Sequence, residues 1–290
     1  MNNVKPLFFL LLLFNLYNVN LLSQTNSTNI KTIVIDPGHG GKDSGTLGTK
    51  RFNIYEKHVA LAVSLKLGNY ISKAFPDVKI IYTRDTDVFL ELNERTEIAN
   101  KSNADLFISI HCDGFTNPKP SGASVFVMGM SKLKANMDVA MRENSAIYLE
   151  DNYQQKYDGF VPKSAKSYIV FSLMQNTYLN QSLQIAEEVE NEFSTRANRK
   201  SRGVKQAPFY VISRTNMPSI LVECGFLTNP KEEEFLHSDL GQDYIASAIF
   251  RAFRSYKQNI EMPLDAVNEK SNDLNDNFLI FYCFYSRRTS

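Results

Sequence analysis

Three short apolar runs along the chain each end in a histidine or a glutamate within a turn that contains glycine. The runs and their turns occupy residues 33–41, 106–114 and 219–225. Short runs rich in β-branched residues and closed by glycine or proline predict buried strands that lead into turns. His39, His111 and Glu223 stand at the three ends. We therefore expect three buried strands that each deliver one polar side chain to a loop.

Helical patterns alternate with these strands. Residues 78–82 and 123–128 are further strand candidates, and apolar residues recur at helical spacing in residues 54–75, 92–100, 178–193 and 244–256. This alternation predicts an α/β fold in which a mostly parallel or mixed twisted sheet is flanked by helices. Residues 30–259 are expected to form a single domain.

Two segments do not follow this alternation of strands and helices. Residues 131–168 are charged and rich in Tyr, Asn and Gln, which predicts an inserted segment with a helix over residues 133–149. Residues 260–290 form an acidic, Asn-rich linker and a short apolar tail of unknown role. The apolar run at residues 278–285 is too short to span a bilayer.

The first 23 residues have the pattern of a secretory signal peptide. A single lysine precedes an apolar stretch, and small polar residues follow it. Asn15, Asn18 and Asn20 interrupt the stretch, which argues against a stable transmembrane segment. We expect export with cleavage near Ser23, and a retained anchor is the alternative.

Composition excludes one class of partner. The 290 residues are 43% hydrophobic and carry a formal net charge of +1, which argues against electrostatic binding of nucleic acid. Three cysteines cannot form a disulfide framework, so Cys112 and Cys224 are expected to be buried free thiols.

The strand ends suggest a metal centre. Loops at the carboxyl ends of strands form the ligand crevice of an open α/β sheet, and a catalytic zinc site needs three protein ligands. His39 and His111 are candidate ligands, and Glu56, at the start of the next expected helix, is the third. Glu223 is then free to act as a general base. Each residue alone also has an ordinary interpretation, such as a hydrogen-bonded histidine or a carboxylate favoured by a helix dipole. His58 and His237 are left out of the proposed site.

Several motifs in order resemble the amidase-3 family of zinc-dependent N-acetylmuramoyl-L-alanine amidases. The resemblance covers about residues 31–256 and is carried by residues 35–43, 56–57, 82–85, 92–95, 99–100, 109–113 and 222–229. It implies a phosphorylase/hydrolase-like catalytic domain with one Zn²⁺ on His39, Glu56 and His111. Glu223 would be the catalytic carboxylate.

The resemblance also implies the reaction and its setting. The amide between N-acetylmuramic acid and L-alanine in peptidoglycan would be hydrolysed, for cell-wall remodelling, daughter-cell separation or recycling. The location would be the periplasm or cell envelope, with secretion as the alternative. For Arg84 and Arg95, which recur in the family pattern, we favour ion pairs that fix loops and helices over contacts with substrate.

Related proteins from Gram-negative envelopes often carry a helix at the inserted position that covers the zinc site. A carboxylate of that helix can take the open coordination position until an activator binds, and a LytM-type protein is the candidate activator. Glu143 and Glu150 are the candidate carboxylates in this chain. An ordinary solvated helix face is the alternative.

Two other functions remain open from the sequence. One is a zinc peptidase that cuts within the stem peptide or another exported amide. The other is a silent wall-binding module that keeps the metal for structure, although a structural zinc closes with four ligands and has no need of Glu223 as a base.

Overall fold

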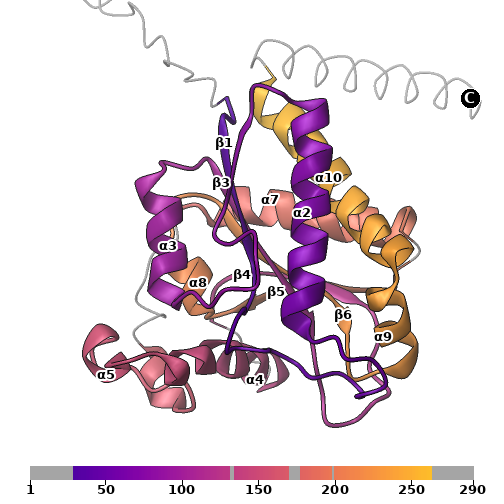
Figure 1. Ribbon diagram of the computed structural model, residues 1–290. Helices are drawn as coiled ribbons and strands as arrows, with labels where there is room; N and C mark the ends of the chain where they lie inside the picture. The colour runs from indigo at the N-terminus through magenta and orange to yellow at the C-terminus, as the bar shows by residue number, and fades with distance from the viewer. Residues whose placement is uncertain (1–28, 131–133, 170–176, 198, 263–290) are drawn as a thin grey trace, which may run out of the picture. The chain divides into compact units, whose positions relative to one another are not determined.

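Six strands form one mixed sheet in the order β2-β1-β3-β6-β4-β5. Figure 1 shows helices on both sides of these strands. The computed structural model describes residues 29–130, 134–169, 177–197 and 199–262. The strands are β1 (Thr32–Pro37), β2 (Lys79–Tyr82), β3 (Leu106–Asp113), β4 (Ala123–Met128), β5 (Ser201–Ala207) and β6 (Ser219–Phe226). The first four in sheet order are parallel, β4 is antiparallel to β6, and β5 is parallel to β4. The expected α/β fold with a mixed sheet is confirmed.

Helices cover both faces of this sheet. On one face α2 (Glu56–Ala74) and α7 (Leu179–Thr195) contact the strands, and α10 (Asp239–Glu261) packs against both helices. On the other face α3 (Leu92–Lys101) and α8 (Tyr210–Ser213) share a hydrophobic core with the strands. A further helix, α9 (Pro230–His237), follows β6 and contacts it.

The alternation of side chains along the strands decides where the polar residues point. Phe107 of β3 and Leu221 of β6 belong to the core on the α3 and α8 face. Side chains two and four residues further along a strand point to the same face. His111 and Glu223 therefore lie on that face, and the β3–β6 register pairs them directly. The strand ends thus bring two residues together that are 112 positions apart in the sequence.

The inserted segment is helical but irregular. It contains α4 (Lys134–Glu143), the 3-10 turn η1 (Asn144–Leu149), α5 (Tyr153–Lys156) and a second 3-10 turn, η2 (Ala165–Tyr168). The helix expected over residues 133–149 is thus present, but it tightens from α to 3-10 geometry at Asn144. That residue is 1% exposed and donates to the carbonyl of Pro208 and to the Tyr168 hydroxyl, while its own oxygen accepts from the Tyr210 amide. These bonds fix α4 to the body of the fold.

Some expectations fall outside the described residues. They are the signal peptide at residues 1–23 and most of the linker and tail at residues 260–290. Residues 29–259 pack as one compact unit. Within the described part of the chain, no helix combines the length and the apolar character that crossing a membrane requires. Cys112 and Cys224 are both buried free thiols, as expected.

A buried ion pair joins β1 to α3. Asp36 is fully buried, and its carboxylate accepts from the Arg95 guanidinium at 2.8 Å and from the hydroxyls of Thr83 and Ser109 at 2.6 and 2.7 Å. Burial alone would raise the pKa of Asp36, but Arg95 and the two hydroxyls outweigh burial and hold the pKa below its ordinary value. The carboxylate is therefore charged and serves as the counterion of a 2% exposed arginine.

We expect Asp36→Ala to reduce the free energy of unfolding by about 3–5 kcal/mol, because it leaves a buried guanidinium without its counterion. Urea denaturation followed by circular dichroism measures this loss. Asp239→Ala, which removes a surface ion pair with Lys66, should change the stability far less. Equal losses in the two variants would contradict the prediction.

Candidate metal centre and active site

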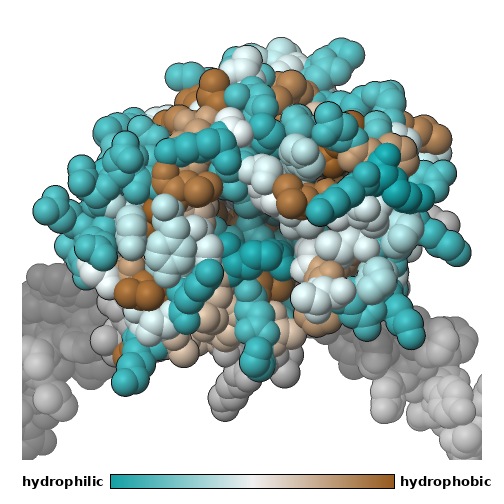
Figure 2. Space-filling model, turned by 60° about the horizontal axis from the view of Figure 1, so that its bottom comes forward, coloured by the Kyte–Doolittle hydropathy of each residue, from teal (hydrophilic) through white to brown (hydrophobic). Residues whose placement is uncertain are grey.

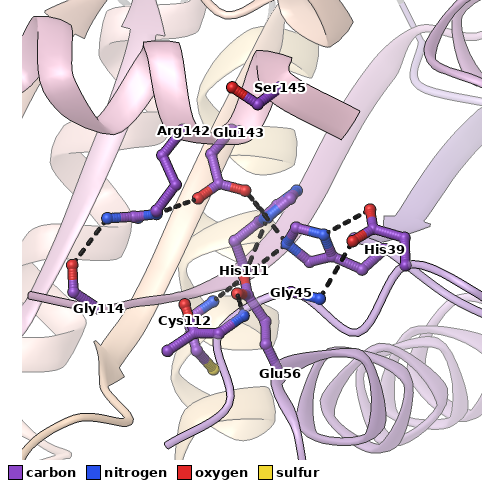
Figure 3. A network of polar contacts seen from close by, with 12 residues as sticks. His39, Gly45, Glu56, His111, Cys112, Gly114, Arg142, Glu143 and Ser145 are labelled. Carbon is purple, nitrogen blue, oxygen red and sulfur yellow. Dashed lines mark hydrogen bonds and ion pairs between the residues drawn. The ribbon is translucent and has the colours of Figure 1, made fainter. Parts of the chain in front are cut away.

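His39, Glu56 and His111 meet at one point at the carboxyl end of the parallel strands. His39 lies in the loop after β1, Glu56 is the first residue of α2, and His111 lies near the end of β3. The Nε2 atom of His39 is 3.0 Å from Glu56 Oε1, and the Nδ1 atom of His111 is 3.1 Å from the same oxygen. All three side chains are buried. Figure 3 shows the two imidazoles converging on the Glu56 carboxylate.

The donor atoms at this point suit a zinc ion. Two imidazole nitrogens and a carboxylate oxygen are a common ligand set of catalytic zinc, and bonds of about 2.0 Å place neighbouring tetrahedral ligands about 3.3 Å apart. Within the described residues the buried Nε2 of His39 has no hydrogen-bond partner, although it faces two carboxylates. Lone pairs that face one another in a buried space need a cation or a proton between them. The residues present therefore fit the metal.

Electrostatics leads to the same conclusion. Burial lowers the pKa of the His39 imidazole, but the Glu56 charge and the Asp43 hydrogen bond outweigh burial and raise it well above its ordinary value. The pKa of His111 is also raised, because the neighbouring carboxylates of Glu143 and Glu56 outweigh burial. Both shifts mean that the surrounding carboxylates favour a positive charge at this point. A bound cation would supply that charge.

Polar groups around the cluster orient its members. His39 Nδ1 is 2.8 Å from Asp43 Oδ2, which fixes the ring so that Nε2 faces the cluster. The Glu56 carboxylate accepts from the amides of Cys112 and Thr46, both at 2.8 Å. Sequence reasoning assigned no role to Asp43 or Thr46. The position of Asp43, four residues after His39 in the same turn, was the only available signal.

Glu223 lies beside the cluster without joining it. Its side chain is fully buried, and within the described residues neither carboxylate oxygen has a hydrogen-bond partner. The Nη2 atom of Arg142 approaches Oε1 at 3.8 Å. Burial raises the pKa of Glu223 well above its ordinary value, and the nearby charges of Asp113 and Glu143 raise it further. A carboxyl group with a raised pKa can exchange a proton near neutral pH.

The inserted segment contributes a fourth member of the cluster, which is its second carboxylate. Glu143, the last residue of α4, places Oε2 at 3.1 Å from His39 Nε2 and at 3.2 Å from His111 Nδ1. One ligand atom from each of His39, Glu56, His111 and Glu143 lies within 4.8 Å of the others. Burial would raise the pKa of Glu143, but Arg142 and the two imidazoles outweigh burial and hold it well below its ordinary value. Glu143 is thus a buried carboxylate anion.

The second candidate carboxylate of the insertion lies elsewhere. Glu150 accepts from the Tyr157 hydroxyl at 2.7 Å and from the Leu92 amide at 3.0 Å, at the start of α3. His58 and His237, which the sequence left out of the site, are also apart from the cluster. The first accepts from the Tyr55 amide, and the second packs its ring against Phe52.

Arg142 is a site residue that sequence reasoning missed. Its guanidinium donates to the Gly114 carbonyl at 2.7 Å and to Glu143 Oε1 at 2.9 Å (Figure 3). It also donates to Asp113 Oδ1 at 2.9 Å. It therefore ties the end of α4 to the end of β3. Nothing in the local sequence separates Arg142 from an ordinary surface arginine, because its partners on the body of the fold, Asp113 and Gly114, come from about 30 positions earlier.

Little space remains beside the imidazoles. A cavity of about 20 Å³ lies between His39, His111, Glu143 and the α8 region, which is room for roughly one water molecule. Figure 2 looks onto this end of the molecule, where the surface is largely hydrophilic around a shallow hollow. Glu143 of α4 forms part of the wall of this space.

Comparisons with known proteins agree on one family. The family model described as N-acetylmuramoyl-L-alanine amidase matches residues 33–255. N-acetylmuramoyl-L-alanine amidase AmiA of Escherichia coli K12 is 37% identical over 229 residues, which cover 78% of this chain and 76% of that protein. AmiC of E. coli O6:H1 is 34% identical over 230 residues, which cover 77% of this chain and 52% of that protein.

Solved structures show the same architecture. An N-acetylmuramoyl-L-alanine amidase from Clostridium difficile 630 superposes with a TM-score of 0.59 at 28% identity, covering 79% of this chain and 97% of that one. AmiC2 of Nostoc punctiforme gives a TM-score of 0.58 at 29% identity, with the same coverage.

Proposed function

Because the chain belongs to the family of N-acetylmuramoyl-L-alanine amidases, we propose that it uses one zinc ion to hydrolyse the amide between N-acetylmuramic acid and L-alanine in peptidoglycan. The observation that carries the proposal is the buried cluster of His39, Glu56 and His111 beside the unpaired carboxylate of Glu223. A silent wall-binding module would have no use for that carboxylate, because an unpaired buried carboxyl group destabilises the fold.

His39, Glu56 and His111 would hold the zinc. A zinc ion bound there supplies Lewis-acid chemistry at the scissile carbonyl and makes water easier to deprotonate. Asp43 would keep the His39 ring in the tautomer whose Nε2 is free for the metal. The amides of Cys112 and Thr46 would hold the Glu56 carboxylate in place. These contacts reduce the reorganisation that metal binding requires.

Glu223 would transfer a proton from the attacking water to the leaving group. Its carboxylate would accept a proton from the attacking water and then donate that proton to the departing nitrogen of L-alanine. The raised pKa suits both steps, since the group must gain the proton readily and also release it. Both oxygens lack hydrogen-bond partners among the described residues, so neither has to break a bond first.

We further propose that α4 keeps the site closed and that Glu143, rather than Glu150, occupies the position that water or substrate needs. The support is its oxygen at 3.1 and 3.2 Å from the two imidazole nitrogens. The residues on either side of it hold the helix in place, because Arg142 bonds the end of β3 and Asn144 bonds the loop before α8. A LytM-type protein that displaces the inserted segment, residues 131–168, would act as the activator.

The substrate sets the location of the protein. Peptidoglycan lies outside the cytoplasmic membrane, so the catalytic domain must be exported to act on it. We propose that residues 1–23 serve as the signal peptide and that the mature chain works in the periplasm or is secreted.

Digestion of purified peptidoglycan tests the proposed reaction. We expect free stem peptides that begin with L-alanine and glycan strands without peptides, and mass spectrometry of the products identifies both. A chelator should stop the digestion and added zinc should restore it. Cleavage within the stem peptide would instead identify a zinc peptidase.

Glu223→Gln should strongly slow turnover while leaving zinc bound. The amide has nearly the same shape as the carboxylate but cannot accept the proton, and loss of a general base typically slows a reaction by about 10²–10⁴-fold. Zinc content by elemental analysis and product formation by chromatography give the two readouts. Activity at the wild-type level would show that the role assigned to Glu223 is wrong.

Glu143→Gln should raise the basal rate of digestion. It removes a charge-assisted contact of about 1.5–3 kcal/mol, which corresponds to roughly a 10- to 100-fold shift toward the open site. Glu150→Gln is the matched control, because Glu150 lies in the same insertion but bonds Tyr157 and Leu92. Equal rates for the wild type and Glu143→Gln would rule out closure by this residue.

A further inference from the structure

Arg84 lies behind the metal centre, between the loop that carries His39 and the start of the helix that carries Glu56. It is 3% exposed and follows β2. Its Nε donates to the Pro37 carbonyl at 3.0 Å, and its Nη1 donates to the Thr86 carbonyl at 3.0 Å. Its Nη2 donates to two carbonyls, those of Gly38 at 2.7 Å and Lys57 at 2.9 Å.

The two carbonyls bonded by Nη2 belong to neighbours of metal ligands. Gly38 immediately precedes His39, and Lys57 immediately follows Glu56. A single nitrogen atom thus connects the backbone beside one ligand to the backbone beside the other. The buried Arg95, by comparison, donates to the carbonyls of Pro37 and His39 and, within the described part of the chain, makes no bond to α2.

A second connection runs parallel to the first. Asp87 accepts from the Gly41 amide at 2.8 Å and from Lys57 Nζ at 2.6 Å. Lys57 Nζ also donates to the Gly41 carbonyl at 2.9 Å. We call Arg84, Asp87 and Lys57 the bracket, because together they join the loop after β1 to the first turn of α2 at two points.

The loop after β1 needs such support. His39 has a φ of 59°, in the left-handed region that is unfavourable for a residue with a side chain. Gly40 follows with a φ of 128°, and a Cβ atom there would lie 2.1 Å from the Val88 carbonyl oxygen. The surroundings must therefore impose this conformation on the loop. His111 has no such need, because it lies within β3.

We propose that Arg84 is a positioning residue that fixes the separation of His39 and Glu56 before a metal binds, and that it thereby sets the metal affinity of the site. This inference rests on the proposed zinc centre. Arginine suits the role because its planar guanidinium offers five donors in fixed directions, whereas a lysine ammonium offers three donors at a single point. Four backbone carbonyl oxygens accept from the Arg84 guanidinium, an arrangement that suits the fixed donors of arginine.

Arg84→Lys tests the proposal with the full chain and zinc alone. We expect zinc affinity, measured by competition with a chromophoric chelator, to fall by about 10- to 100-fold, the usual effect of losing a group that orients metal ligands. The visible absorption of the Co²⁺-substituted protein should also change, because it reports ligand geometry. If Arg84→Lys only lowered the stability of the fold, the folded variant would keep the wild-type Co²⁺ spectrum.

Arg251→Lys is the matched control. Arg251 bonds Glu192 at 2.6 Å between α10 and α7, away from the metal centre, so its substitution should leave zinc affinity and the Co²⁺ spectrum unchanged. Asp87→Ala removes an exposed member of the bracket and should weaken zinc binding in the same direction, even if Arg84→Lys does not fold.

Wild-type zinc affinity in folded Arg84→Lys, or in Asp87→Ala where Arg84→Lys does not fold, would overturn the inference. A wild-type chain that binds no zinc would instead contradict the proposed function.

Discussion

The buried carboxylate of Glu56 is the group on which the rest of the site depends. It is fully buried at the first turn of α2, where the helix dipole favours a negative charge. Two backbone amides and two imidazoles surround it, so residues from the first loop, from α2 and from β3 all meet at one oxygen pair. Without that anion the two imidazoles would have only Glu143, a residue of the inserted segment, as a carboxylate partner at this point. The sheet brings the strand ends close together, and the Glu56 carboxylate connects the histidines at those ends into one site.

Charge balance explains the arrangement around this point. Glu56, Glu143, Asp113 and Glu223 bring four carboxyl groups into one buried region, and Arg142 is the arginine among them. Such a density of carboxylates is unstable without cations. Burial raises the pKa of Glu223, and the excess of negative charge raises it further; the same excess raises the pKa values of the two imidazoles against the effect of burial. A metal ion in the cluster would relieve the excess where it is greatest.

The parts of the fold that could be predicted from the sequence are those whose pattern lies within a few neighbouring residues. The apolar runs that became β1, β3 and β6 carry their pattern within a few residues, and so do the polar residues that end them. By contrast, β5 was missed, because the run Ser201–Ala207 is largely polar and lies half-buried at the sheet edge. Glu143 and Glu150 could not be separated from the sequence, since both lie on the same segment. Only the fold shows that one reaches the imidazoles and the other reaches Tyr157. Arg142 has contacts so remote in sequence that no local pattern could reveal them.

Arg142 and Glu143 are neighbours on the same short helix, one positive and one negative. If α4 moves away from the site, it removes both charges together, and the net charge of the region it leaves is unchanged. Salt screens long-range attraction between separated charges, but it has little effect on the displacement of a neutral pair. Ionic strength alone would therefore be a weak trigger for opening. When α4 leaves the site, its hydrogen bonds and ion pairs with the rest of the domain must be replaced by similar contacts. The surface of another folded protein can supply such contacts, whereas a change of salt concentration cannot.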